Sequence, residues 1–278
     1  MSDGVLTVGE ALHHARARGI DRLDAQLLLA HVLARPRSWL IAHDDATLDA
    51  AQQTALLSAF ARRAGGEPLA YVVGTKEFHG LALTVDPRVL VPRPETELLV
   101  DWALELLAGA LAHVALPSVV DLGTGSGAIA LAVKQVHAVA DVDATDVSGP
   151  SLAVARANAL RLGLDVAFLE GPWWAPIEGR RFDLALSNPP YIATGDSHLP
   201  ALRHEPIQAL SPGGDGLDAL RQIVRGAPDH LQPGGWLLLE HGYDQAQAVY
   251  ALLHQHGFTG LETRRDLGGR PRCSGGHR

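Results

Sequence analysis

The segment Asn188-Pro189-Pro190-Tyr191 follows the apolar run 182–187 and ends it abruptly. Proline cannot donate a hydrogen bond to a sheet, so a strand must stop there. The Asn188 side-chain oxygen and the Pro189 carbonyl could accept both N–H groups of a planar NH2 group. Pro190 stiffens the turn, and Tyr191 offers a ring that can stack on a flat substrate group. These residue types favour methylation of an amide-like nitrogen, with positioning rather than a strong base as the source of catalysis.

A glycine-rich loop lies between a predicted strand, 118–122, and a predicted helix that begins at residue 128. It comprises Gly123, Thr124, Gly125, Ser126 and Gly127. Glycines at this place let the backbone approach a ligand that faces the helix N-terminus. The loop also fits the loose dinucleotide pattern G-x-G-x-x-A, and it could be a tight turn without a ligand.

Two carboxylates narrow the choice of ligand. Asp121 precedes the loop, where a negative charge would repel a pyrophosphate but tolerate a sulfonium. Asp146 closes the next predicted strand, where a carboxylate can accept both ribose hydroxyls, although it could instead cap a helix. A nucleoside with a positive centre satisfies both positions, and S-adenosylmethionine is such a molecule.

The elements that position these residues alternate between strand and helix from residue 117 onward. Apolar strands are predicted around 118–122, 141–146, 164–171, 182–187 and 234–242. This alternation predicts an α/β fold with a mostly parallel, doubly wound sheet. Because ligands bind beyond the carboxyl ends of such strands, the glycine loop and Asn188 are expected to face one crevice.

Residues 1–75 are predicted to be helical. Thr7 with Glu10 and Asp49 with Gln52 fit capping boxes, and Asp21 fits a helix start. Residues 77–91 alternate and are predicted to form a β-hairpin that turns at Asp86-Pro87. Pro94 suits the first position of a further helix, and the terminal segment 273–278, rich in glycine, is expected to be mobile.

Composition excludes several classes of protein. The 278 residues carry a net charge of −8, so no basic stripe for nucleic acid is expected. The single cysteine, Cys273, excludes a disulfide framework and fits a cytoplasmic setting. Despite fourteen histidines, no zinc-binding motif occurs and no metal is expected. No signal peptide and no membrane-spanning run are apparent.

The paired stretches DLGTGSG and SNPPYI resemble the amino-methylating class I methyltransferases. Three further stretches, GEPLAYVVGTKEFHG, VLVPRPETELLV and EPIQALSPGGDGLDALRQIV, make the chain similar to the protein-(glutamine-N5) methyltransferases that act on peptide chain release factors. The resemblance covers residues 62 to about 272. It implies an N-terminal helical substrate-docking domain, 1–75, a hairpin linker, 76–93, and a seven-stranded methyltransferase domain, 94–278.

The resemblance also implies a reaction and a set of roles. The methyl group of S-adenosylmethionine would pass to the glutamine side chain of the Gly-Gly-Gln motif in class 1 release factors. The loop 123–127 would cradle the cofactor, Asp146 would bind its ribose, Trp173 would lie beside adenine, and residues 188–191 would hold the glutamine. Pro172 stands where the family often has Asp, which removes a polar side chain beside the adenine amino group.

Three other functions share parts of this pattern. Glutamine methylation of a large-subunit ribosomal protein would use identical chemistry. A DNA adenine N6-methyltransferase would use the same Asn-Pro-Pro-Tyr segment, but it usually carries a basic recognition domain that this acidic chain lacks. A non-catalytic or nicotinamide-dependent protein could use the glycine loop alone. A protein partner without nucleic acid or membrane is therefore expected.

Overall fold

The computed structural model describes residues 5–278 and divides the chain into two compact units, which meet in sequence between Thr75 and Lys76. Residues 1–4 lie outside the described residues. The first positions of the predicted helical domain, and the start of the segment in which no signal peptide is expected, fall among them.

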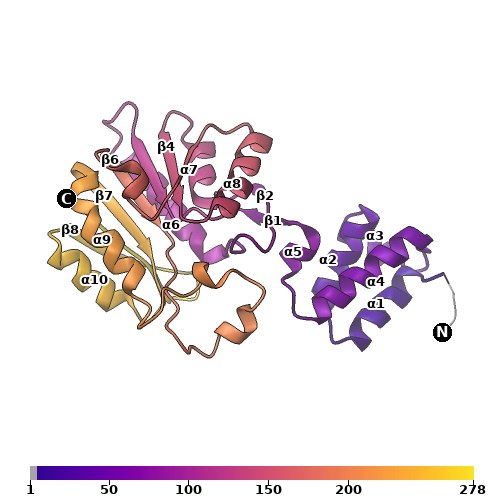
Figure 1. Cartoon of the computed structure of the whole chain (residues 1–278). Coiled ribbons are helices and arrows are strands. Elements are labelled where there is room, and N and C mark those ends of the chain that lie inside the picture. The colour runs from indigo at the N-terminus through magenta and orange to yellow at the C-terminus, as the bar shows by residue number, and fades with distance from the viewer. Residues whose placement is uncertain (1–4) are drawn as a thin grey trace. The chain divides into compact units, whose positions relative to one another are not determined.

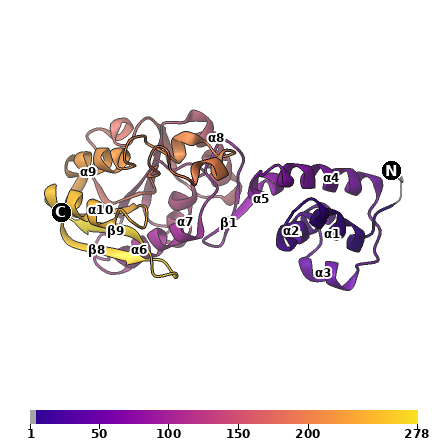
Figure 2. The same ribbon diagram turned by 90° about the horizontal axis from the view of Figure 1, so that it is seen from below.

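The N-terminal unit is helical (Figure 2). Its helices are α1 (Val8–Ala17), α2 (Arg22–Leu33), α3 (Arg37–Ala42), α4 (Ala50–Ala64) and α5 (Leu69–Val73). The capping boxes predicted at Thr7 and Asp49 are confirmed, and the Asp21 side chain caps α2. Leucines from α2 and Phe60 of α4 form a core of their own, which is why the unit packs as a bundle.

A short hairpin follows, built from β1 (Thr75–Phe78) and β2 (Leu81–Thr84). The predicted turn at Asp86-Pro87 is wrong, because the chain reverses at His79 and Gly80 instead. Both of these residues have positive φ, 47° and 77°, which suits the twist of a two-residue hairpin turn. The Asp86 carboxylate accepts from the Arg88 backbone N–H at 3.0 Å, a local turn beyond the hairpin.

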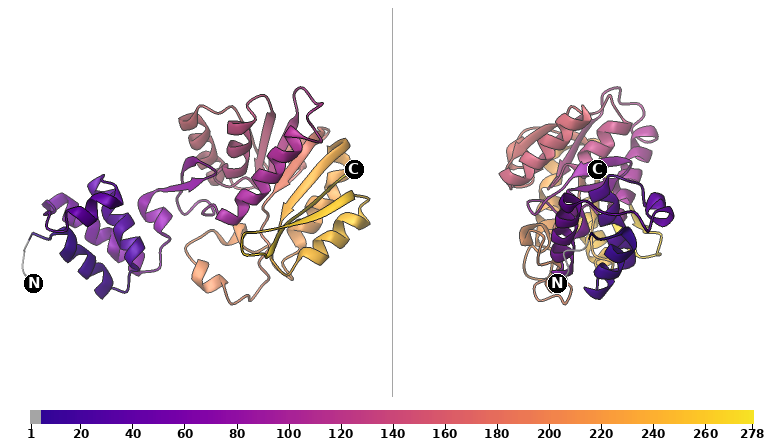
Figure 3. Two further views of the ribbon diagram at one scale, coloured as in Figure 1. Left: turned by 180° about the vertical axis from the view of Figure 1, so that it is seen from behind. Right: turned by 90° about the vertical axis from the view of Figure 1, so that its right-hand side faces the viewer.

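The second unit contains a seven-stranded sheet with the order β5-β4-β3-β6-β7-β9-β8 (Figures 1 and 3). Five strands run parallel, and β9 is antiparallel to both β7 and β8. This topology confirms the predicted seven-stranded α/β fold. The strands are β3 (Ser118–Leu122), β4 (Asp141–Asp146), β5 (Ala167–Glu170), β6 (Phe182–Ser187), β7 (Leu231–Glu240), β8 (Thr259–Arg265) and β9 (Pro271–His277).

Helices cover both faces of the sheet (Figure 1). Alternate residues of a strand point to opposite faces. Val119 accordingly belongs to a core cluster shared with α6 (Glu97–Ala108) and α7 (Ala128–Val136), whereas Val120 belongs to a second cluster shared with α9 (Asp218–His230) and α10 (Ala246–Gln255). The α8 helix (Gly149–Leu162) contributes Ala159 to the first cluster. Short 3-10 turns include η1 (Pro94–Thr96), η2 (Ala175–Ile177), η3 (Leu199–Leu202) and η4 (Ile207–Ala209).

The expectation of a mobile C-terminal end is wrong, because most of that segment is the buried inner strand β9. Its glycines allow close packing rather than freedom. A Cβ on Gly275 would lie 2.4 Å from a Leu238 methyl carbon, and one on Gly276 would lie 2.5 Å from a Leu261 methyl carbon.

Candidate functional site

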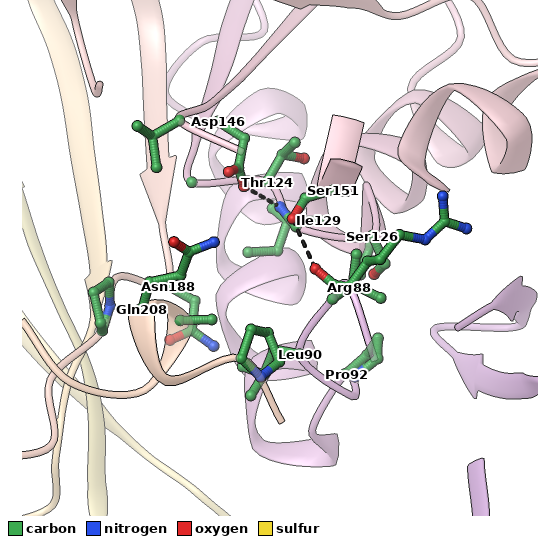
Figure 4. Close-up of a pocket in the computed structure, with 18 of the residues that line it drawn as sticks. Arg88, Leu90, Pro92, Thr124, Ser126, Ile129, Asp146, Ser151, Asn188 and Gln208 are labelled. Carbon is green, nitrogen blue, oxygen red and sulfur yellow. Dashed lines mark hydrogen bonds between the residues drawn. The ribbon is translucent and has the colours of Figure 1, made fainter. Parts of the chain in front are cut away.

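A pocket lies at the carboxyl ends of β3, β4 and β6, where the parallel strands deliver the residues singled out from the sequence (Figure 4). The predicted residues that line it are Gly123, Thr124, Gly125, Ser126, Asp146, Trp173, Asn188 and Pro190. Gly127, Pro189 and Tyr191 adjoin these residues in sequence but are not among those that line the pocket. The fold therefore brings the glycine loop and Asn188 to one cavity, as parallel strands require.

The glycine loop needs its glycines. Gly123, Gly125 and Gly127 have φ of 76°, 57° and 84°, values that disfavour other residues. A Cβ on Gly123 would lie 3.1 Å from the Trp173 ring, so the backbone passes directly beside that indole. Gly127 is the N-cap of α7, whose free N–H groups therefore begin at the loop.

Buried polar side chains hold the loop from below. The Thr124 hydroxyl donates to Asp121 Oδ2 at 2.6 Å, and Asn158 Nδ2 donates to the Ser126 carbonyl at 3.0 Å. Asp121 is fully buried, and burial raises its pKa to about 7. Its Oδ1 has no partner within residues 5–278, so the carboxylate keeps acceptor capacity beneath the loop.

Asp146 ties the loop to the end of β4. Its Oδ2 accepts from the Gly125 N–H at 2.8 Å (Figure 4). Its Oδ1 accepts from the Ser148 N–H at 2.8 Å. Burial raises the pKa of the Asp146 carboxyl. Each carboxylate oxygen can accept a second hydrogen bond, so Asp146 can also receive hydroxyl donors from a ligand in the pocket.

The two adjacent tryptophans have different environments. Trp173 lines the pocket with φ of 47°, and its Nε1 donates to Gln222 Oε1 at 3.1 Å. Trp174 is buried against α9, where its Nε1 donates to the Ile223 carbonyl at 3.0 Å. Pro172 also lines the pocket and brings no polar side chain to it.

The segment that follows β6 is anchored by buried groups. Asn188 Nδ2 donates to the Thr96 hydroxyl oxygen at 3.0 Å, and the Tyr191 hydroxyl donates to Glu240 Oε1 at 3.2 Å. The Tyr191 carbonyl accepts from Gln245 Nε2 at 3.0 Å. Burial, with the nearby Glu240 charge, raises the pKa of Tyr191, so its hydroxyl stays protonated at neutral pH.

Sequence reasoning assigned no site role to two further stretches of the pocket wall. One is the extended segment around Arg88, Leu90 and Pro92, and the other is the loop that carries Gln208. In Figure 4, Asn188 and Gln208 lie on one side of the pocket, and Arg88 and Ser126 lie on the other.

An ion pair joins these two stretches. Buried Glu205 accepts from Arg93 Nη2 at 2.5 Å and from the Val91 N–H at 3.0 Å. No local sequence pattern signals this contact, because Glu205 lies 112 positions from Arg93 and 114 from Val91.

Within residues 5–278, no group of three or more His, Cys, Asp or Glu side chains could hold a metal ion. No helix among these residues has the length and apolar character needed to cross a membrane.

Two family models match the chain. Residues 5–74 match the PrmC N-terminal domain, and residues 97–249 match the methyltransferase small domain. Solved structures resemble it at the level of fold. A methyltransferase from Pyrococcus furiosus has a TM-score of 0.53 at 20% identity, covering 81% of this chain and 97% of that one. The 16S rRNA N2 G1207 methyltransferase of T. thermophilus was solved with AdoMet and guanosine. It has a TM-score of 0.54 at 22% identity, and the match covers 73% of this chain and 49% of that one.

Sequence relatives are much closer than these structures. A release factor glutamine methyltransferase of Bordetella pertussis is 50% identical over 262 residues, which is 93% of this chain and 96% of that protein. A protein of the same name in Xylella fastidiosa is 48% identical over 96% of each chain. Another, in Burkholderia pseudomallei, is 49% identical over 94% of this chain and 93% of that protein. Because identity of this degree extends across both units, the chain belongs to the family of release factor glutamine methyltransferases.

Proposed function

We propose that this protein transfers a methyl group from S-adenosylmethionine to the side-chain amide nitrogen, N5, of the glutamine in the Gly-Gly-Gln motif of class 1 release factors. The observation that carries the proposal is the Asn188 carboxamide. It lines the same pocket as the glycine loop, in a chain about half identical to release factor glutamine methyltransferases. An S-adenosylmethionine donor supplies an electrophilic methyl group on a sulfonium.

The pocket fits such a donor. Positive-φ glycines leave the loop open, Asp146 retains lone pairs for ribose hydroxyls, and the Trp173 indole borders the loop. The loop residues Gly123, Thr124, Gly125, Ser126 and Gly127 would hold the methionine and sugar portion. Trp173 would pack beside adenine. Buried Asp121 lies beneath the loop, and its carboxylate, when ionised, favours a cationic ligand over a pyrophosphate.

The substrate amide needs acceptors rather than a base. Its nitrogen lone pair is delocalised into the carbonyl, as the rotation barrier of roughly 18–20 kcal/mol for a peptide bond indicates. Asn188 Oδ1 and the Pro189 carbonyl would each accept one N–H of the glutamine NH2 group. This arrangement holds the nitrogen so that its lone pair points toward the methyl donor. Pro190 stiffens the turn, and the Tyr191 ring would pack on the flat amide.

Orientation of this kind can supply much of the rate enhancement over the uncatalysed reaction. Effective molarities of well-oriented reactants correspond to about 7–11 kcal/mol of barrier.

The two units would divide the work. We propose that residues 1–75 form a docking domain for the release factor, that 76–93 act as a linker, and that 94–278 perform the methyl transfer. A protein acting on release factors would work in the cytoplasm, where translation terminates. Asn188, Pro189 and Tyr191 would serve catalysis, and residues 188–191 would bind the substrate.

The test is methyl transfer from labelled S-adenosylmethionine to a purified class 1 release factor. We expect labelling of the wild-type factor and none after Gln→Ala in its Gly-Gly-Gln motif. Labelling that survives this change would contradict the assignment. A large-subunit ribosomal protein and an adenine-containing DNA duplex serve as competing methyl acceptors. Preferential labelling of either one would identify it, and not the release factor, as the substrate.

A further inference from the structure

A buried hydroxyl lies directly behind the proposed substrate acceptor. Thr96, at the end of η1, is 4% exposed, and its oxygen accepts from Asn188 Nδ2 at 3.0 Å. The Thr96 hydroxyl also faces the Glu240 carboxylate, and its hydrogen bond lowers the pKa of Glu240. Thr96 therefore connects the Asn188 amide to a carboxylate.

The sheet register places that carboxylate. Ser187, the last residue of β6, pairs with Leu239 of the parallel strand β7. Asn188, just beyond β6, and Glu240, the last residue of β7, therefore follow neighbouring positions. Glu240 is 1% exposed and accepts from the Tyr191 hydroxyl with Oε1. Its Oε2 is buried and has no hydrogen-bond partner of standard geometry within residues 5–278, which leaves acceptor capacity for the Thr96 proton. One carboxylate thus contacts Tyr191 directly, and Thr96 lies between that carboxylate and Asn188.

The polarity of this chain of hydrogen bonds has one consistent direction. An ionised carboxylate can only accept, so the Thr96 hydroxyl must donate its single proton to Glu240. The Thr96 oxygen can then only accept from Asn188, which requires the NH2 end of that amide to face Thr96. The oxygen end is left for the pocket.

We propose that Thr96 and Glu240 are positioning residues that set the orientation of the Asn188 carboxamide, so that its oxygen faces the substrate NH2 group. The inference deepens the proposed function and rests on the acceptor role given there to Asn188. Without this polarity, the amide could present its own NH2 to the substrate NH2, donor against donor.

Several charged or titratable groups surround Glu240. Burial raises the pKa of Glu240 to about 7, and the Arg272 charge on β9 lowers it while Glu95 on η1 raises it. Tyr191 and Cys273 also face the carboxylate. A protonated Glu240 could itself donate a hydrogen bond to the Thr96 oxygen. The Thr96 hydroxyl would then no longer have to donate to Glu240, and the orientation of the Asn188 amide would no longer be fixed.

The first test compares Thr96→Val with Thr96→Ser, which keeps the hydroxyl. In Thr96→Val the Asn188 N–H that faces residue 96 has no partner when substrate binds. We expect kcat/KM for the release factor to fall about tenfold, as for one unsatisfied buried donor. Affinity for S-adenosylhomocysteine should stay within about twofold, and Thr96→Ser should restore most of the activity.

A double-mutant cycle separates positioning from general damage. In the Asn188→Ala background, Thr96→Val should cause no further loss in single-turnover rate, because Thr96 acts through Asn188. Wild-type activity in Thr96→Val, equal loss in Thr96→Ser, or a further tenfold loss on top of Asn188→Ala would each overturn the inference.

A second measurement needs no activity and no folded Thr96→Val protein. The Asn188 side-chain NH2 resonance is assigned by its absence from the spectrum of Asn188→Ala. We expect its shift to titrate with a midpoint near pH 7, following Glu240, and the titration to vanish in Glu240→Gln. A titration unchanged in Glu240→Gln would overturn the inference. Failure of the wild type to label any release factor would instead contradict the proposed function and leave this spectroscopic result standing.

Discussion

Replacing Asp146 by asparagine tests the cofactor site with little change in shape. Both carboxylate oxygens of Asp146 already accept a backbone N–H at 2.8 Å, from Gly125 and from Ser148. An asparagine has one oxygen, so its NH2 group must oppose one of these donors. The substitution therefore removes one charge-assisted hydrogen bond and places donor against donor at the edge of the glycine loop.

The magnitude follows from counting these bonds. A hydrogen bond to a charged group contributes about 1.5–3 kcal/mol. Losing the hydrogen bond from Gly125 or Ser148 destabilises the free protein. Removing a buried charge offsets part of this cost. We therefore expect the free energy of unfolding to fall by about 1 kcal/mol. Binding loses the proposed charged acceptor for ribose, a separate cost of about 1.5–3 kcal/mol. This cost predicts roughly ten- to hundredfold weaker binding of S-adenosylhomocysteine.

Calorimetry with S-adenosylhomocysteine measures the affinity, and denaturant unfolding of the free protein measures stability. Asp143→Asn is the matched control, since Asp143 lies on the same strand but pairs with Arg180 at 2.5 Å and does not line the pocket. Its affinity should stay within about twofold of wild type. Binding by Asp146→Asn within threefold of wild type, or equal losses in both variants, would refute the reasoning.

Four further substitutions probe other parts of the site. Asn188→Ala and Tyr191→Ala should lower kcat, the former by about 10²-fold, while S-adenosylhomocysteine affinity changes far less; equal loss of both would contradict the substrate role. Gly127→Ala places a methyl 3.0 Å from a Leu131 methyl carbon at φ of 84°, so denaturation should reveal a loss of about 1–3 kcal/mol, and no loss would refute the strain. The raised Glu240 pKa means that folding favours its protonated form, so this contribution to stability is full below its ordinary value of 4.5, falls progressively as pH rises, and is nearly gone above about pH 7. Unfolding free energy of Glu240→Gln should therefore rise relative to wild type by about 1 kcal/mol between pH 6 and pH 8, and a constant difference would contradict the assigned shift.

Local patterns predicted much of the fold and part of the site. Capping boxes at Thr7 and Asp49, the glycine loop and the strand that ends before Asn188 depend on neighbouring residues, so they can be read along the chain. The parallel arrangement then follows from strand and helix alternation. These features explain why the loop and Asn188 could be expected at one edge of the sheet.

The remaining features depend on partners distant in sequence. The Glu205 contact to the Val91 N–H joins residues 114 positions apart, and the Asn188 contact to Thr96 joins residues 92 apart. Nothing near Thr96 or Glu240 distinguishes them from a helix start and a strand end. The prediction of a mobile C-terminal segment is wrong for a related reason. A run of glycines suggests mobility, and the packing of Leu238 against Gly275 that requires a glycine there involves a residue distant in sequence.

Glu240 raises the question of whether a carboxylate with a pKa of about 7 acts as a general base. Methyl transfer to an amide nitrogen leaves a positive charge that is lost with a proton, but geometry argues against direct transfer to Glu240. The carboxylate is 1% exposed and does not line the pocket. It is separated from the pocket by Thr96, which faces it, and by Tyr191, whose hydroxyl donates to it. A base must reach the proton that it removes. Glu240 is therefore better suited to orient the side chains that meet the substrate, and the amide proton can leave once its nitrogen is alkylated and far more acidic.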